Sequence, residues 1–348
     1  MKSLFKNATK LGLAALLIST SAIAGNGDRR GQAGASELLI NPWARSSGWG
    51  MANSASVVGL EAIYGNVAGI AFTNKTELLF SRTSWLMGTD ININSFGFSQ
   101  RVGESGVLAM GIMSMDFGDI QITTVDNPEG GLGTFSPQYM NLNLSYSREF
   151  SNSIYGGMTF KVITEEISDV SARGVALDAG IQYVTGENQN IRFGIALKNV
   201  GPRMRFNGDG LSFRGVVPNG NSMTVEQRSE SFELPSLLNI GGSYRFDLNE
   251  SHKLTTAATF TSNSFVNDQY RLGLEYSYKN LLKLRGGYVY EDGILDPTTR
   301  TTALTGPSGG FTLELPYGGN GTTIGIDYSY RATNPFNGTH SFGARINL

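Results

Sequence analysis

The chain of 348 residues has 45 glycines, no cysteine and a formal net charge of −2. The absence of cysteine excludes a disulfide-held scaffold, and the slightly acidic charge argues against a nucleic-acid partner. The mean hydropathy is −0.13. Beyond the N-terminus no run of about 18 apolar residues occurs, which excludes a membrane-spanning helix.

Residues 1–24 have the pattern of a secretory signal peptide. A basic start, a short apolar core and a small-residue cleavage site follow one another as Lys2, Lys6, Lys10, Leu11–Ile18 and Ala22–Ala24. We expect cleavage before Gly25, which removes three lysines and leaves 24 basic against 29 acidic residues, a net charge of −5. The sequence therefore predicts export from the cytoplasm.

Residues 37–72 differ from the rest of the exported chain. They are rich in small residues and glycine turns, and apolar and polar residues alternate poorly there. We therefore separate an N-terminal segment, residues 25–75, from a region of regular strands at 76–348.

In the region of regular strands, apolar and polar residues alternate in fourteen segments. The run Val175–Tyr183, for example, has apolar residues at its odd positions and mostly polar or glycine residues at its even ones. A period of two places these sets on opposite faces of a strand. The predicted strands are 76–84, 92–101, 106–117, 140–149, 154–166, 174–184, 190–200, 237–247, 252–260, 269–279, 281–291, 310–316, 322–332 and 340–348.

The connections between these strands alternate in length. Tight ones, with hairpin residues such as Gly, Asn, Asp and Ser, follow the even strands at 102–105, 150–153, 185–189, 248–251, 279–280 and 317–321. Those after odd strands are mostly longer, the largest being 118–139, 201–236 and 292–309. Short turns at one end and long loops at the other are typical of outer-membrane barrels. A soluble adhesin-like sandwich is the alternative, but it has no reason to sort its loops by parity.

The chain ends in a strand whose apolar residues Phe342, Ala344, Ile346 and Leu348 share one face, as a barrel-closing strand requires. We therefore predict an all-β fold: an antiparallel transmembrane β-barrel of about 14 strands, preceded by the N-terminal segment and located in the cell outer membrane as a multi-pass protein.

The polar face of the predicted strands carries charges of both signs. They are Lys161, Asp178, Arg192, Lys198, Arg245, Lys253, Arg271, Glu275, Lys283, Arg285 and Asp327. If the apolar face meets lipid, these groups line the interior. Their mixed signs favour a packed, salt-bridged lumen over an ion-selective pore.

The N-terminal segment resembles the start of the PorV/PorQ family, a branch of the FadL-like barrels. Members begin with a pattern similar to G-A-R-A-x-G-M-G-x-A followed by N-P-A-G-L. The matching residues here are Arg45, Gly48, Gly50, Met51, Asn66, Ala68 and Gly69. Val67 stands where the family usually has proline.

The resemblance implies that residues 25–75 form a plug-like segment within a fourteen-stranded barrel. It further implies a non-enzymatic role in the type IX secretion system of Bacteroidetes. The expected partners are outer-membrane lipid, translocon or attachment-complex proteins, and their secreted cargo, with no cofactor. The alternative within the same superfamily is a FadL-like transporter of hydrophobic compounds, against which the lumen charges argue mildly.

Catalytic and metal chemistry find little support in the sequence. The two histidines, His252 and His340, fall at opposite ends of the predicted barrel, and no Gly-x-Ser-x-Gly motif occurs. The acidic cluster Asp116, Asp119, Asp126 and Glu129 lacks the spacing of a calcium loop and is better explained as solvated. We therefore predict no catalytic, cofactor-binding or metal-ligating residue.

The longest loop, 201–236, combines mixed charge with apolar residues. Phe206, Phe213 and Phe232 are candidates for docking a partner, since a long ordered loop usually has a use. The competing explanation is a solvated loop of mixed charge, and the sequence does not decide between the two.

Overall fold

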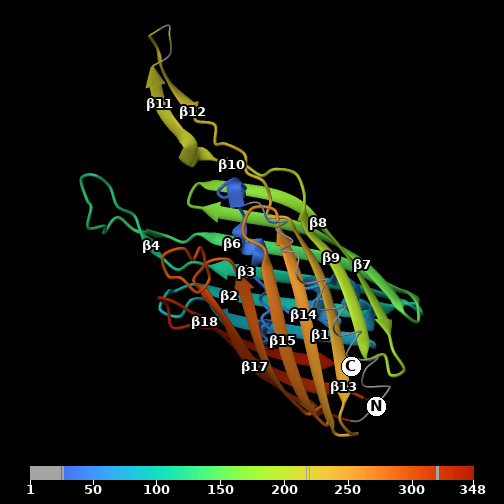
Figure 1. The fold of residues 1–348 in the computed structure, drawn as a ribbon. Coiled ribbons are helices and arrows are strands. Elements are labelled where there is room, and N and C mark those ends of the chain that lie inside the picture. Colours follow the sequence, from blue (N-terminus) through green and yellow to red (C-terminus); the bar gives the residue numbers. More distant parts are fainter. Residues whose placement is uncertain (1–24, 26, 217, 219, 319–320) are drawn as a thin grey trace.

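The structure, a computed structural model, describes residues 25, 27–216, 218, 220–318 and 321–348. The predicted signal peptide, residues 1–24, lies outside the described residues. The described chain forms a closed antiparallel barrel of fourteen long strands (Figure 1). These are β1 (Thr76–Ser84), β2 (Asn92–Val102), β3 (Gly106–Asp116), β6 (Gln138–Ser151), β7 (Ile154–Ile167), β8 (Val170–Thr185), β9 (Ile191–Val200), β13 (Leu237–Asp247), β14 (His252–Asn263), β15 (Gln269–Tyr278), β16 (Leu282–Glu291), β17 (Leu304–Pro316), β18 (Thr323–Thr333) and β19 (Thr339–Asn347).

Each long strand pairs with its neighbours in the chain, and β1 pairs with β19 to close the barrel. The fourteen predicted strands are all present. The tight connections lie together at one end, which we call the turn end, and the longer ones at the other, the loop end. The connection between β7 and β8 departs from the predicted pattern, because it spans only residues 168–169.

Two strands begin four or more residues earlier than predicted. Strand β8 starts at Val170 rather than at residue 174, because its outward side chains Ser171 and Arg173 are polar and hide the alternation. Strand β17 starts at Leu304 rather than at residue 310. Its first half is glycine-rich, and its register against β18 shifts between Leu304 and Ser308, so a period of two does not hold there.

The two faces of the barrel have opposite character. Outward side chains are apolar and exposed, as at Leu272 with 61% exposure, whereas inward side chains such as Lys161 and Asp178 are polar and buried. An apolar outside and a polar inside suit a wall that faces lipid. Among the described residues, none belongs to a helix long and apolar enough to cross a membrane, a finding with no bearing on a barrel.

The N-terminal segment lies inside the barrel. Its short helices are η1 (Gly27–Arg29), η2 (Ser36–Leu39), α2 (Ala44–Gly48), η3 (Gly59–Ile63) and η4 (Val67–Phe72). Helix α2 contacts β16–β19, η3 contacts β1–β3, and η4 contacts β3 and β6–β8. The main apolar core joins this segment to the wall, with Trp43, Leu60 and Ile70 fully buried.

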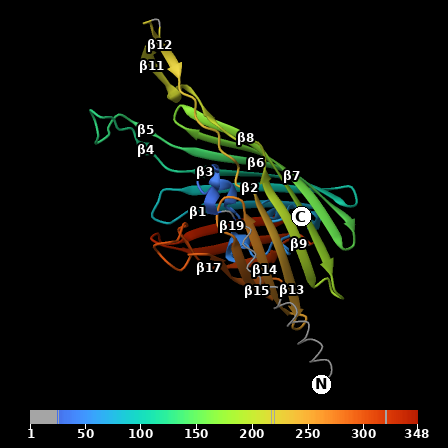
Figure 2. The same ribbon diagram turned by 45° about the horizontal axis from the view of Figure 1, so that its top comes forward.

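Six short elements extend the loop end. The hairpin β4 (Ile120–Gln121) and β5 (Thr134–Phe135) lies in the loop after β3. In the longest loop, β10 (Phe206–Asn207) pairs with β8, η5 (Asp209–Leu211) follows, and β11 (Ser212–Val216) pairs with β12 (Ser222–Glu226). The β11–β12 hairpin projects well beyond the barrel in both ribbon views (Figures 1 and 2).

Candidate functional site: the filled lumen and a groove in the wall

The N-terminal segment meets the bare backbone of the wall at inward-facing glycines. A Cβ atom at Gly287 would lie 2.2 Å from the carbonyl carbon of Trp49, and one at Gly273 would lie 2.7 Å from the Trp49 ring. Only glycine permits so close an approach. On the opposite wall the contact is looser, since a Cβ at Gly97 would lie 3.3 Å from the Leu60 side chain. The lumen is therefore filled up to the wall backbone at this level.

Buried ion pairs tie the segment to the wall. Arg345 of β19 pairs with Asp327 of β18 and lies 3.6 Å from Glu77 and 3.9 Å from Glu61 of η3. Arg45 of α2 reaches the same Asp327 at 3.6 Å. We call these five residues the anchor network. Because it joins α2 and η3 to three wall strands, it holds the segment at one height in the barrel.

Further lumen charges are paired within the wall or with the segment. Lys161 Nζ lies 2.7 Å from Asp178, and Arg285 Nε lies 2.5 Å from Glu275. Lys198 Nζ donates to the carbonyl oxygen of Tyr64 at 2.6 Å. The predicted inward placement of these charges is confirmed, and the lumen is packed and salt-bridged as expected.

The residues that carry the family resemblance all lie in the N-terminal segment, some against the wall and some against the segment itself. Gly48 packs on the backbone of Gly310, and Gly50 and Met51 adopt φ values of 63° and 58° to turn the chain. Gly69 abuts the Val57 carbonyl oxygen, where a Cβ would lie 2.1 Å away.

Asn66 caps helix η4. Its side-chain oxygen accepts from the Ala68 amide at 3.2 Å, while its amide donates to the Ile181 carbonyl of β8 at 3.0 Å. Val67 is the first residue of η4, the position at which proline is best tolerated in a helix. Valine at this position is compatible with the same capped turn.

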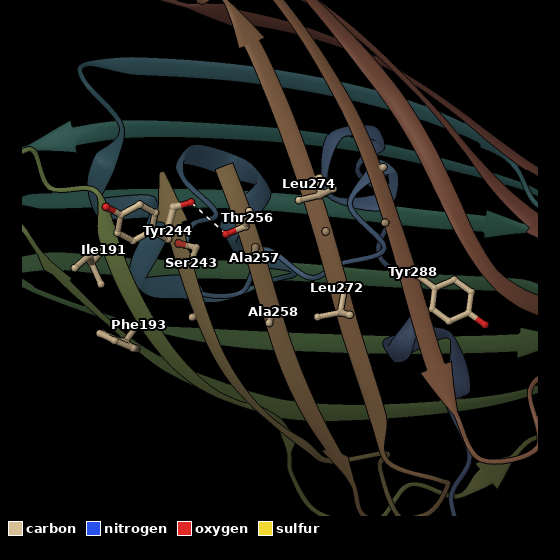
Figure 3. A pocket seen from close by; sticks show the side chains of 14 residues that line it. Ile191, Phe193, Ser243, Tyr244, Thr256, Ala257, Ala258, Leu272, Leu274 and Tyr288 are labelled. Atoms are coloured by element: carbon tan, nitrogen blue, oxygen red, sulfur yellow. Dashed lines mark hydrogen bonds between the residues drawn. The ribbon is translucent and has the colours of Figure 1, made fainter. Parts of the chain in front are cut away.

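A groove runs over the outer face of β9 and β13–β16 (Figure 3), with a volume of about 830 Å³. Its lining is almost wholly apolar. The outward-facing residues that line it are Ile191, Phe193, Gly242, Tyr244, Thr256, Ala258, Leu272, Leu274, Gly286 and Tyr288.

The floor of the groove consists of small residues. Gly242 and Ala258 are opposite one another in the register, and a Cβ at Gly286 would meet nothing within 4 Å. Behind this floor, Trp49 presses on the inward glycines of β15 and β16. At this patch the wall is thin, with few side-chain atoms on either face. We call it the wall groove.

The sequence analysis did not identify the wall groove. The sequence does contain a sign of the groove, since Gly242, Ala258 and Gly286 each take an outward position that most strands fill with a large apolar residue. These small residues could be recognised as one patch only once the pairing register was known.

The three candidate docking residues separate into two places. Phe206 and Phe232 pack together, with ring centroids 5.8 Å apart, against the apolar core. Phe213 stands apart on the β11–β12 hairpin and is 53% exposed, beside Val216 at 77%. Phe206 and Phe232 anchor the loop, and only Phe213 is available to a partner.

The two histidines lie at opposite ends of the barrel, each beside a tyrosine. His252 contacts the Tyr276 hydroxyl at the turn end, and His340 of β19 lies 2.9 Å from the hydroxyl of Tyr328 in β18. Within the described ranges, no three His, Cys, Asp or Glu residues gather as a metal site would require. The acidic residues in and after β3, which are Asp116, Asp119, Asp126 and Glu129, form no such group.

No family model and no curated protein matches the chain. Solved structures do. The TodX deltaS2S3 mutant monoaromatic hydrocarbon channel has a TM-score of 0.54 at 12% identity, covering 88% of this chain and 98% of its own. The Pseudomonas putida toluene transporter TodX gives 0.53 at 12% identity, covering 84% and 94%. A Pseudomonas aeruginosa FadL homologue gives 0.50 at 13% identity, covering 87% and 96%. The fold is therefore that of the FadL-like outer-membrane barrels.

Proposed function

We propose that this protein is a non-enzymatic outer-membrane channel for hydrophobic compounds, exported by a cleaved signal peptide. The structures it resembles include a toluene transporter and a monoaromatic hydrocarbon channel. The observation that carries the proposal is the wall groove, an apolar concavity of about 830 Å³. Small-molecule sites are typically about 300–1,000 Å³ and mainly apolar.

The position of the groove gives it a role in transport. It lies on the lipid-facing side of the wall, directly behind the contact between Trp49 and Gly287. A hydrophobic compound that leaves the barrel through the wall at this point enters apolar surroundings directly, which favours its transfer into the bilayer. Passage through the lumen itself requires the N-terminal segment to shift, because that segment fills the barrel.

Uptake of radiolabelled toluene by cells that express the protein tests the proposal. Ala258→Phe and Gly286→Phe fill the wall groove and are expected to reduce uptake severalfold. Ser114→Phe is the matched control, since Ser114 is an exposed outward residue of β3 on a different part of the wall. Equal uptake by cells with and without the protein would refute the channel role, and equal uptake by the groove variants would remove the groove from it.

A second candidate function is protein docking in type IX secretion. The β11–β12 hairpin favours it, because this hairpin projects from the loop end (Figure 2) and exposes Phe213, Val216 and Met223. Apolar side chains gathered on a projecting hairpin are typical of contact surfaces.

A mild-detergent pull-down from native outer membranes, analysed by mass spectrometry, tests this second function. Recovery of a large translocon barrel, or of secreted proteins that share one C-terminal domain, would support it. Phe213→Ser is expected to abolish that recovery, whereas Val125→Ser, on the exposed loop after β3, is the control and is expected to keep it. A barrel that carries only lipid would contradict the docking role.

A further inference from the structure

Two arginines are buried on the lumen side of the wall near the loop end. Arg331 of β18 is 6% exposed and Arg271 of β15 is 7% exposed. Gln269 accepts a hydrogen bond from Arg271 at 2.6 Å and donates one to Glu291 at 2.7 Å. Arg331, Arg271 and Glu291 together carry two positive charges and one negative charge. The Glu291 carboxylate is linked through Gln269 to Arg271.

The guanidinium of Arg331 is held in a fixed plane. Its central carbon lies 4.9 Å from the centre of the Trp85 ring, as in a cation–π contact. Its Nε and Nη2 atoms are buried and have no hydrogen-bond partner within the described part of the chain. These two atoms form one edge of the guanidinium, which is the edge that binds an anion with two parallel hydrogen bonds.

Arg331 lines a small cavity of about 40 Å³. Gly50 of the N-terminal segment, Ser308 of β17, Thr302 of the adjoining loop and the buried Ile294 lie around it. Gln269 and Glu291 line it as well, and the Glu291 carboxylate there accepts a hydrogen bond from Gln269. The Thr302 hydroxyl accepts from the Leu304 amide at 3.2 Å and so retains its own proton to donate. The cavity has room for one small ion and none for a hydrocarbon chain.

We propose that this cavity is a binding site for a single small monovalent anion of the chloride class. A buried guanidinium edge without a hydrogen-bond partner is unfavourable, and the two arginines outnumber the single carboxylate of Glu291, so an anion on the free edge of Arg331 offsets that cost. Bound there, the anion links β18 to Gly50 and to the loop over β16 and β17. The site is independent of the proposed transport of hydrophobic compounds.

Thermal unfolding of the full-length purified protein in detergent tests the site. Sodium chloride, sodium bromide and sodium gluconate are compared at equal ionic strength, since gluconate is too large to enter. Ligands that bind only the folded state raise its stability. We expect a melting temperature several degrees higher in chloride or bromide than in gluconate.

Arg331→Gln is expected to remove the difference between chloride and gluconate. Arg285→Gln is the matched control, because Arg285 is equally buried but paired with Glu275. It is expected to lower the melting temperature and keep the chloride effect.

Broadening of the chloride NMR signal by the wild-type protein, reversed by bromide, provides a readout that does not depend on any variant folding. Equal melting temperatures in all three salts, or a chloride effect that survives in Arg331→Gln, would overturn the proposal.

Discussion

Glu233 connects the start of the N-terminal segment to the longest loop. Its carboxylate lies 2.9 Å from Arg29 and 2.8 Å from Arg203. The backbones pair as well, since the Gly34 amide donates to the Glu233 carbonyl at 3.1 Å. Hydrogen bonds from Arg203 and Arg29 lower the pKa of Glu233 below its ordinary value of 4.5. A lowered pKa means that the ionised side chain favours the tethered state.

This tether predicts a pH dependence. The contribution of Glu233 is fully present above pH 4.5 and is lost as the pH falls through its lowered pKa. Hydrogen exchange measured near neutral pH is expected to be several-fold faster at Gly34 in Glu233→Gln than in the wild type. Below the lowered pKa the two proteins should exchange alike. Glu230→Gln, in the same loop, is the control, and faster exchange in that variant would attribute the effect to loop charge in general.

At the scale of single elements, β16 offers two adjacent glycines with opposite surroundings. Gly287 faces inward and touches the Trp49 backbone, whereas Gly286 faces outward into open space. Overpacking a filled site costs about 1–3 kcal/mol or more. Gly287→Leu is therefore expected to lower the urea midpoint of unfolding clearly, and Gly286→Leu to leave it nearly unchanged. Similar midpoints for both variants would show that the segment yields easily to the wall.

The strands themselves could be predicted because each wall strand has lipid on one face and a packed lumen on the other, so apolar and polar residues alternate along it. The prediction failed where this alternation is interrupted. Residues 304–309 of β17 lie at a bulge, and Ser171 of β8 faces outward without an apolar side chain. The β4–β5 and β11–β12 hairpins were not predicted either, since they stand outside the apolar band.

The candidate sites depended on pairing that the sequence does not display. Arg45 was identified by family resemblance, but its partner Asp327 lies 282 positions later and becomes a neighbour only through the register of β18. The wall groove depends in the same way on Gly242 and Ala258 falling opposite each other. The local sequence pattern predicts single strands, whereas these contacts join residues of different strands and so depend on how the strands pair.

At the scale of the whole molecule, the N-terminal segment occupies the lumen of the barrel. The inward glycines allow the segment to fill the lumen, and the anchor network fixes it there. Asp327 is central because it binds Arg345 of the wall and Arg45 of the segment together. Removing one partner of a buried ion pair typically costs about 3–5 kcal/mol. For Asp327 that loss falls on the pair between β18 and β19 as well as on the contact between the segment and the wall.

Single-channel recording in planar bilayers therefore gives a direct test of closure. The wild-type protein is expected to pass little current. Asp327→Asn is expected to show frequent openings, because Arg45 then keeps only Glu314, at 4.0 Å, and the segment is held less firmly. Asp178→Asn is the matched control, since Asp178 is equally buried but pairs with Lys161 across two wall strands. It is expected to weaken the wall without opening the lumen. Steady current through the wild type would mean that the segment does not close the barrel, and identical traces from both variants would mean that the anchor network does not hold it.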